Sequence, residues 1–291
     1  MSVPTSSLLV ERDDSLPLVH VAASTLSGAA VDDVSLSGLS RLATRLARRT
    51  AGGQPTEAID EQLEALGGAM GVDCGHESIS LSGTVLARNF EPFMDLLSSM
   101  ICSPGLSPDE LERLERETLA ERLEVLDSDQ QLAQRWFARS VFTEHPYGRS
   151  VVGTRETLAR ASVSHVEATL RRHFRAENLL FSFAGDVDVR AAERWAQSIR
   201  RGVGSLGESL PGAVGEPRAR AGRHLVFVDK PERTQTQILI GGLGGHPRDE
   251  DYFDLMVATT AFGGTFTSRL SQEIRAKRGW SYGAYSSLGS W

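Results

Sequence analysis

The chain has 291 residues, enough for one large or two ordinary domains with substantial cores. Forty per cent of the residues are apolar and 24 per cent are charged, which is the composition of a soluble globular protein. The net charge is -7 and the basic residues are dispersed among acidic ones, so nothing in the composition favours nucleic-acid binding. We therefore expect no nucleic-acid partner.

Membrane and export signals are also missing from the sequence. No stretch approaches about 18 uncharged apolar residues, the length that a transmembrane helix needs. The first residues, MSVPTSSLLVERDDSL, lack a basic segment followed by an apolar one, so we expect no secretory signal, no membrane partner and a cytoplasmic location. The two cysteines, Cys74 and Cys102, have no metal-ligand spacing and are expected to be buried free thiols.

Strands followed by helices are expected in the first two thirds of the chain. Alternating apolar residues predict strands at 7–12 and 17–25, and helical spacing predicts a helix over 37–49 that ends at Gly52. Strands first and helices packed on one face make an α+β unit. The further elements expected there are a helix at 56–66, strands at 69–73 and 76–85, helices at 90–102, 108–126, 130–142 and 164–173, a strand at 179–184 and a helix at 191–199.

The composition changes after this unit. Residues 201–222 contain six glycines and two prolines without periodicity, and we interpret them as an interdomain linker. The chain is thus predicted to consist of a first domain at 1–200, this linker, and the start of a second domain at 223–291. In the second domain we expect strands at 224–229, 235–241 and 281–288 and helices at 252–262 and 268–277.

The helix over 37–49, GLSRLATRLARR from Gly38, carries two different faces. Arg41, Thr44 and Arg45 share one of them, at spacing i, i+3 and i+4. The apolar residues that recur at helical spacing and face the core are Leu39, Leu42, Ala43 and Leu46.

From residue 35 onward the chain resembles the pitrilysin/insulysin family of zinc metallopeptidases. The signature of that family is an inverted motif, H-x-x-E-H, on a helix entered through a Gly-Leu step. Here the frame is kept, but the three functional positions read Arg41, Thr44 and Arg45. A guanidinium has no lone pair for zinc, which binds neutral imidazole, thiolate or carboxylate. The hydroxyl of Thr44 does not titrate near neutrality, so it cannot act as the general base.

The resemblance also implies a third zinc ligand, a glutamate in a later helix that runs into an acidic turn. Glu121, within ETLAERLEVLDSD, matches that place. One carboxylate does not make a zinc site. We therefore expect this chain to bind no metal and no other cofactor, and we expect zinc in a partner subunit.

A second matching segment, FGGTFTSRLSQEIRAKRGWSYGAYSS, spans residues 262–287. It resembles the family segment in which an arginine and a tyrosine bind the substrate backbone near the zinc, here Arg275 and Tyr282. An arginine in the last turn of a helix and a tyrosine after a turn at Gly279 can converge and donate to a carbonyl or an oxyanion. Read from the residues alone, Arg275 instead complements the helix dipole and Tyr282 is an amphipathic strand residue.

The resemblance implies two related domains per subunit, each with a mainly antiparallel sheet covered by helices on one face, so the second domain is expected to be incomplete. It also implies a function, because in two-subunit bacterial and organellar members one chain keeps the zinc motif while the other supplies the arginine-tyrosine pair. We predict a non-catalytic subunit of a heteromeric zinc endopeptidase, inactive alone, whose partners are a homologous subunit with intact H-x-x-E-H and an extended peptide. The alternatives are a structural or scaffolding peptidase-like subunit and a peptide-binding pseudoenzyme without turnover.

Overall fold

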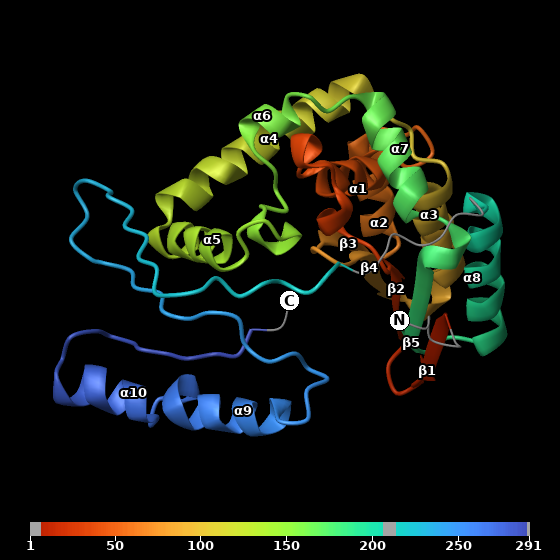
Figure 1. The fold of residues 1–291 in the computed structure, drawn as a ribbon. Helices are drawn as coiled ribbons and strands as arrows, with labels where there is room; N and C mark the ends of the chain where they lie inside the picture. The colour runs from red at the N-terminus through yellow and green to blue at the C-terminus, as the bar shows by residue number, and fades with distance from the viewer. Residues whose placement is uncertain (1–6, 206–213, 290–291) are drawn as a thin grey trace. The chain divides into compact units, whose positions relative to one another are not determined.

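The computed structural model describes residues 7–205 and 214–289 and separates into two compact units (Figure 1). Unit 1 contains residues 1–218 and 224–238, and unit 2 contains residues 219–223 and 239–291. The division predicted from the sequence, with its linker at 201–222, stays a prediction. Residues 206–213 of that linker lie outside the described residues.

Unit 1 is built on a five-stranded sheet with the order β1-β5-β2-β4-β3. β1 is parallel to β5, and the other neighbours are antiparallel. The α+β class and the strands expected in this part of the chain are therefore confirmed. The strands are β1 (Leu8–Arg12), β2 (Leu18–Thr25), β3 (Ala69–Cys74), β4 (Ile79–Leu86) and β5 (Leu179–Gly185).

The core lies on one face of this sheet. Val19, Val21 and Ala23 of β2 are fully buried, while His20 between them is exposed and contacts Thr84. Because side chains alternate along a strand, this pattern places all buried side chains of β2 on one face. The helices α1 (Leu39–Arg49), α3 (Phe90–Cys102) and α8 (Val189–Val203) pack against β3, β4 and β1 respectively.

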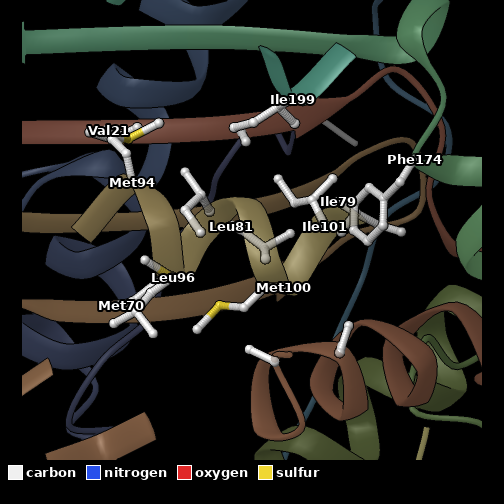
Figure 2. Packing of buried hydrophobic residues seen from close by; sticks show 14 of the residues in the cluster. Val21, Met70, Ile79, Leu81, Met94, Leu96, Met100, Ile101, Phe174 and Ile199 are labelled. Atoms are coloured by element: carbon white, nitrogen blue, oxygen red, sulfur yellow. The ribbon is translucent and has the colours of Figure 1, made fainter. Parts of the chain in front are cut away.

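Helix α3 supplies much of the packing against the sheet. Figure 2 shows Met94 and Met100 of α3 among side chains of the strands, including Leu81. Phe93 is fully buried and approaches Gly83, where a Cβ atom would lie 2.7 Å from the ring. Glycine is therefore needed at this position of β4. Burial of each such side chain contributes about 1.5–3 kcal/mol relative to exposure.

The remaining helices of unit 1 agree closely with the sequence predictions, except for α6, a single turn at Arg155–Leu158 that was not predicted. α4 begins as expected, with Pro108 in its first turn and the Ser107 hydroxyl accepting a hydrogen bond from the Glu110 amide. None of the described helices combines the length and apolar character needed to cross a bilayer. Cys74 and Cys102 are free, half-buried thiols. The remaining helices of unit 1 are α2 (Thr56–Ala65), α4 (Pro108–Asp127), α5 (Asp129–Val141), α6 (Arg155–Leu158) and α7 (Val163–His173).

Unit 2 contains two helical segments. α9 (Tyr252–Thr259) is followed directly by a π-helical segment at Thr260–Gly264. α10 (Arg269–Ser271) is likewise followed by a π-helical segment at Gln272–Lys277. The chain then returns alongside the first segment, because the Ser286 amide donates to the Gly263 carbonyl at 3.0 Å. Both predicted helices are thus present.

The strands predicted at 224–229, 235–241 and 281–288 are wrong, since residues 214–289 contain no strand. A strand exists only where a neighbouring strand pairs with its backbone groups. The apolar side chains of these segments find no such support, and those of Leu225 and Ile240 are 92% and 93% exposed. Alternation of apolar residues predicted the strands, but the described part of the chain contributes no ladder for them.

Candidate functional site

The N-terminus of α1 is fixed by a buried carboxylate. Asp32 accepts hydrogen bonds from the amides of Gly38 at 3.1 Å and Ser40 at 3.2 Å, which satisfies donors that a helix start leaves free. Gly38 has a φ of 95°, and a Cβ there would lie 2.6 Å from Gly153 Cα. Leu42 and Leu46 are buried on the core side. The opposite face of α1 is thereby held toward α4.

That face carries the degenerate motif, and its two arginines bracket Glu121. Arg41 Nη2 lies 2.9 Å from Glu121 Oε2, and Arg45 Nη2 lies 2.8 Å from Glu121 Oε1. Partial burial alone would raise the pKa of Glu121, but hydrogen bonds from both arginines and their charges lower it below its ordinary value. The structure therefore brings together the three charged residues that the sequence singled out.

The same arrangement continues one turn further along both helices. Arg49 donates to both carboxylate oxygens of Glu117, from Nη1 at 3.1 Å and from Nη2 at 2.5 Å. Arginines at every fourth position of α1 thus meet carboxylates four positions apart on α4, and we call Arg41, Arg45, Arg49, Glu117 and Glu121 the α1–α4 ladder. The sequence analysis missed Arg49 and Glu117, although their spacing from Arg45 and Glu121 was the available signal.

Thr44 occupies the motif position of the glutamate base but is turned inward. It is 1% exposed, and its hydroxyl donates to the Ser40 carbonyl at 2.8 Å. That bond uses its only proton within the helix. Thr44 therefore has a structural contact in place of a solvent-facing one.

A pocket of about 170 Å³ lies between this face and strand β3. Val72 and Cys74 lie on the face of the sheet that packs against α1, so the side chain of Asp73 between them points to the other face. Burial, with the charges of Asp32 and Asp73, raises the pKa of the Cys74 thiol to about 12, so the thiol stays protonated. The lining residues are Arg41, Thr44, Arg45, Val72, Asp73 and Cys74.

These residues do not fit the zinc ion that the resemblance implies. The donor set contains two guanidiniums, one internally bonded hydroxyl and one carboxylate that both guanidiniums engage. Within the described ranges, no group of three or more His, Cys, Asp or Glu residues is arranged to hold a metal ion. We assign no metal-dependent step to this chain.

Arg275 and Tyr282 both belong to unit 2. The Arg275 guanidinium lies over the Phe266 ring, 4.3 Å from its centroid, and the Tyr282 side chain is 90% exposed. Gly279 turns the chain between them with a φ of 62°, and its amide donates to the Arg275 carbonyl. No hydrogen bond joins the two side chains in this part of the described structure. Their convergence on one ligand stays a prediction.

The structure also shows a buried polar cluster that the sequence analysis did not find. His173, 1% exposed, contacts Ser27 Oγ through Nδ1 and Ser40 Oγ through Nε2, both at 2.8 Å. The Ser40 hydroxyl donates to Asp32, and the Asn178 amide donates to Ser27 Oγ. We call these five residues the His173 network. Its members come from separate parts of the chain, so no local sequence pattern predicted the network.

The network has a definite direction of hydrogen bonding. Because Ser40 gives its proton to Asp32, it must accept from His173, whose proton therefore lies on Nε2. Nδ1 then accepts from Ser27. Burial, with the nearby charges of Arg172 and Arg175, lowers the pKa of His173 to about 4, so the ring is neutral at pH 7.

Comparison with protein families covers nearly the whole chain. The family described as insulinase (peptidase family M16) matches residues 8–155, and the M16 inactive domain matches residues 160–290. The division between the two matches falls just before α7, between the degenerate motif and the segment of Arg275 and Tyr282.

Two curated relatives are described as uncharacterized zinc proteases. The protein of Mycobacterium leprae is 27% identical over 267 residues, which cover 90% of this chain and 59% of the relative. The protein of Rickettsia bellii is 26% identical, with 89% of this chain and 62% of the relative covered. The chain thus spans about three fifths of the length of these relatives.

Solved structures show the same fold. A peptidase M16 inactive domain from Pseudomonas fluorescens matches with a TM-score of 0.83 at 21% identity, covering 97% of this chain and 68% of that chain. Pitrilysin matches with a TM-score of 0.65 at 16% identity, covering 73% of this chain and 23% of pitrilysin. The sequence matches and the fold lead to one conclusion: the chain belongs to the pitrilysin/insulinase family of peptidases, M16.

Proposed function

We propose that this chain is the non-catalytic subunit of a heteromeric zinc endopeptidase, and that a homologous subunit with an intact H-x-x-E-H motif holds the zinc. The observation that carries the proposal is the pairing of Arg41 and Arg45 with Glu121. Both ligand positions are cations, and the remaining carboxylate is committed to them. The match of residues 160–290 to the M16 inactive domain supports a subunit of this kind.

Arg275 and Tyr282 are the residues with which this chain would bind the substrate peptide at the partner's zinc site. A guanidinium and a phenolic hydroxyl are both donors, and aimed at a peptide carbonyl they stabilise the negative charge that develops on its oxygen. The 90% exposure of Tyr282 leaves its hydroxyl available to a substrate held by another chain. The zinc-bearing partner would supply the attacking water and the base.

The experiment is to co-express the chain with the H-x-x-E-H subunit of the same genome and to measure cleavage of a fluorogenic peptide. We expect Arg275→Ala and Tyr282→Phe each to lower kcat by about 10²–10³, the usual effect of removing one such donor. Arg278→Ala is the matched control, because Arg278 lies in the same turn but pairs with Glu273. Unchanged turnover in both test variants would refute the proposed role.

A scaffolding role is the second candidate, and the α1–α4 ladder favours it. The ladder gives the motif helix a structural contact with α4, which a subunit without any part in turnover would also need. Stable stoichiometric association with a neighbour that carries no zinc motif, and without peptide cleavage, would support this candidate. The expected cytoplasmic location stays a prediction in either case.

A further inference from the structure

The pocket beside the degenerate motif contains hydrogen-bond donors that the fold does not use. The side chains of Arg41 and Arg45 are 25% and 19% exposed, so α1 and α4 hold them in place while their tips still reach solvent. Each guanidinium has five N–H donors. In the described structure Arg41 engages Glu121 through Nη2, and Arg45 engages Glu121 through Nη2 and Thr118 through Nη1. The remaining N–H groups stay available to a ligand.

Charges of both signs lie around the pocket. On the side of α1 and α4, two guanidiniums face the single carboxylate of Glu121, which leaves one positive charge on that side. Arg49 and Glu117 form their own pair one turn away and contribute no net charge. Asp73 also lines the pocket, and its charge and that of Asp32 act on the Cys74 thiol on the strand side. An anion is therefore favoured only on the side of Arg41 and Arg45, where the unused N–H donors lie.

We propose that this pocket binds a carboxylate of a peptide, donated to by Arg41 and Arg45. The planar fork of a guanidinium matches the two oxygens of a carboxylate, and such charge-assisted bonds are among the strongest in proteins. A volume of about 170 Å³ has room for a carboxylate, since one buried water needs only about 10–15 Å³ on the same measure. The carboxylate is supplied either by a glutamate or aspartate side chain or by the C-terminus of the peptide.

The two parts of this proposal have different foundations. The preference for a carboxylate rests on the pocket in unit 1 and does not involve Arg275 or Tyr282. The choice of a peptide as the carrier of the carboxylate rests on the proposed function. The experiment therefore needs a small carboxylate as well as peptides.

The peptide arm uses three fluorescent peptides of one sequence and measures their binding to the full chain by anisotropy. One contains a glutamate and an amidated C-terminus, the second has glutamine at that position, and the third has glutamine and a free C-terminus. We expect one of the two carboxylates to improve affinity about tenfold, equivalent to about 1.4 kcal/mol. The peptide that binds more tightly than the one lacking both carboxylates identifies the source of the carboxylate. The gain should shrink at high salt, because the pair is partly exposed.

Variants place the effect in the pocket. Arg41→Gln should abolish the gain, whereas Arg49→Gln should retain it, because Arg49 lies on the same face of α1 but pairs with Glu117 outside the pocket. Circular dichroism and the melting temperature verify that both variants fold. A gain that survives in Arg41→Gln and in Arg45→Gln would place the carboxylate elsewhere and overturn the proposal.

The small-molecule arm uses N-acetylglutamate and follows the arginine Nε–Hε resonances of Arg41 and Arg45 by NMR. Shifts of both resonances on titration, absent with N-acetylglutamine, support the carboxylate site. If these shifts occur but no peptide binds, the carboxylate site stands and the peptide as its carrier fails, while the proposed function is still tested by turnover of the co-expressed complex. If peptides bind equally well with and without a carboxylate, the pocket proposal fails and the proposed function does not. Absence of both kinds of binding overturns the proposal outright.

Discussion

Helix α1 and the segment from Arg275 to Tyr282 differ in whether they keep the functional residues of the family. α1 has lost the chemistry of its motif, yet its apolar stripe is buried, Asp32 fixes its start and the α1–α4 ladder ties it to α4. The second segment keeps the expected arginine and tyrosine, but Tyr282 is almost fully exposed. Packing and chemistry are thus separable. A helix frame is maintained by its core side, so its outer face is free to change from ligands to ion pairs.

This contrast predicts that changes in α1 act mainly on stability, and the core side of the helix should show the largest effect. Leu46 is fully buried, so Leu46→Ala removes buried methyl groups and leaves a cavity. We expect the free energy of unfolding, measured by urea titration, to fall by about 2–5 kcal/mol.

Leu255→Ala is the matched control for Leu46→Ala. It makes the same chemical change in helix α9 of unit 2, where the side chain is already 37% exposed. Its cost should stay below about 1 kcal/mol. Equal losses in the two variants would contradict the contrast between the regions.

The His173 network predicts a pH dependence of comparable size. The unfolded histidine binds a proton below its ordinary pKa of 6.5, while the folded one does so only below about 4. Between these values the unfolded state binds more protons, so stability is fully present above pH 6.5 and falls with decreasing pH. The integrated loss is about 3 kcal/mol. His173→Gln should flatten that part of the profile of unfolding free energy against pH.

Other groups in the network and the ladder set the background for this measurement. Burial raises the pKa of Asp32 despite its hydrogen bonds from Ser40 and Gly38, and this acts against the histidine as the pH falls. The lowered pKa values of Glu117 and Glu121 act with it, because their pairing with arginines is lost on protonation. The comparison of wild type with His173→Gln at each pH removes these shared contributions. An unchanged slope in the variant would mean that His173 does not set the dependence.

The sequence predicted most of unit 1, because periodic apolar residues there coincide with real packing partners. It also predicted the meeting of Arg41, Arg45 and Glu121, but through the family resemblance. The His173 network could not be predicted from the sequence, since it depends on bringing Ser27 and Ser40 to a histidine at the end of α7. The strand predictions after residue 223 failed for the opposite reason. The local pattern was present, but strand formation depends on a neighbour that the pattern does not specify.

The α1–α4 ladder should contribute a smaller and salt-dependent part of the stability. Glu121→Gln removes the charge that both motif arginines engage, and because the side chain of Glu121 is 39% exposed we expect a loss of about 1 kcal/mol. The loss should shrink in 1 M NaCl, where exposed charges are screened. Glu112→Gln is the control, because Glu112 pairs with Arg116 on the open surface of α4 and its loss should be barely measurable.

Of the substitutions considered, Tyr282→Phe should have the smallest effect on stability. The hydroxyl that it removes belongs to a side chain that is 90% exposed, so the free energy of unfolding should change by less than about 0.5 kcal/mol. The same substitution is expected to lower turnover in the heteromeric complex. Loss of turnover without loss of stability would mean that the hydroxyl acts on the substrate and not within the fold. A clear loss of stability in isolated Tyr282→Phe would instead mean that the fold itself uses the hydroxyl, and the separation of packing from chemistry would not hold for this segment.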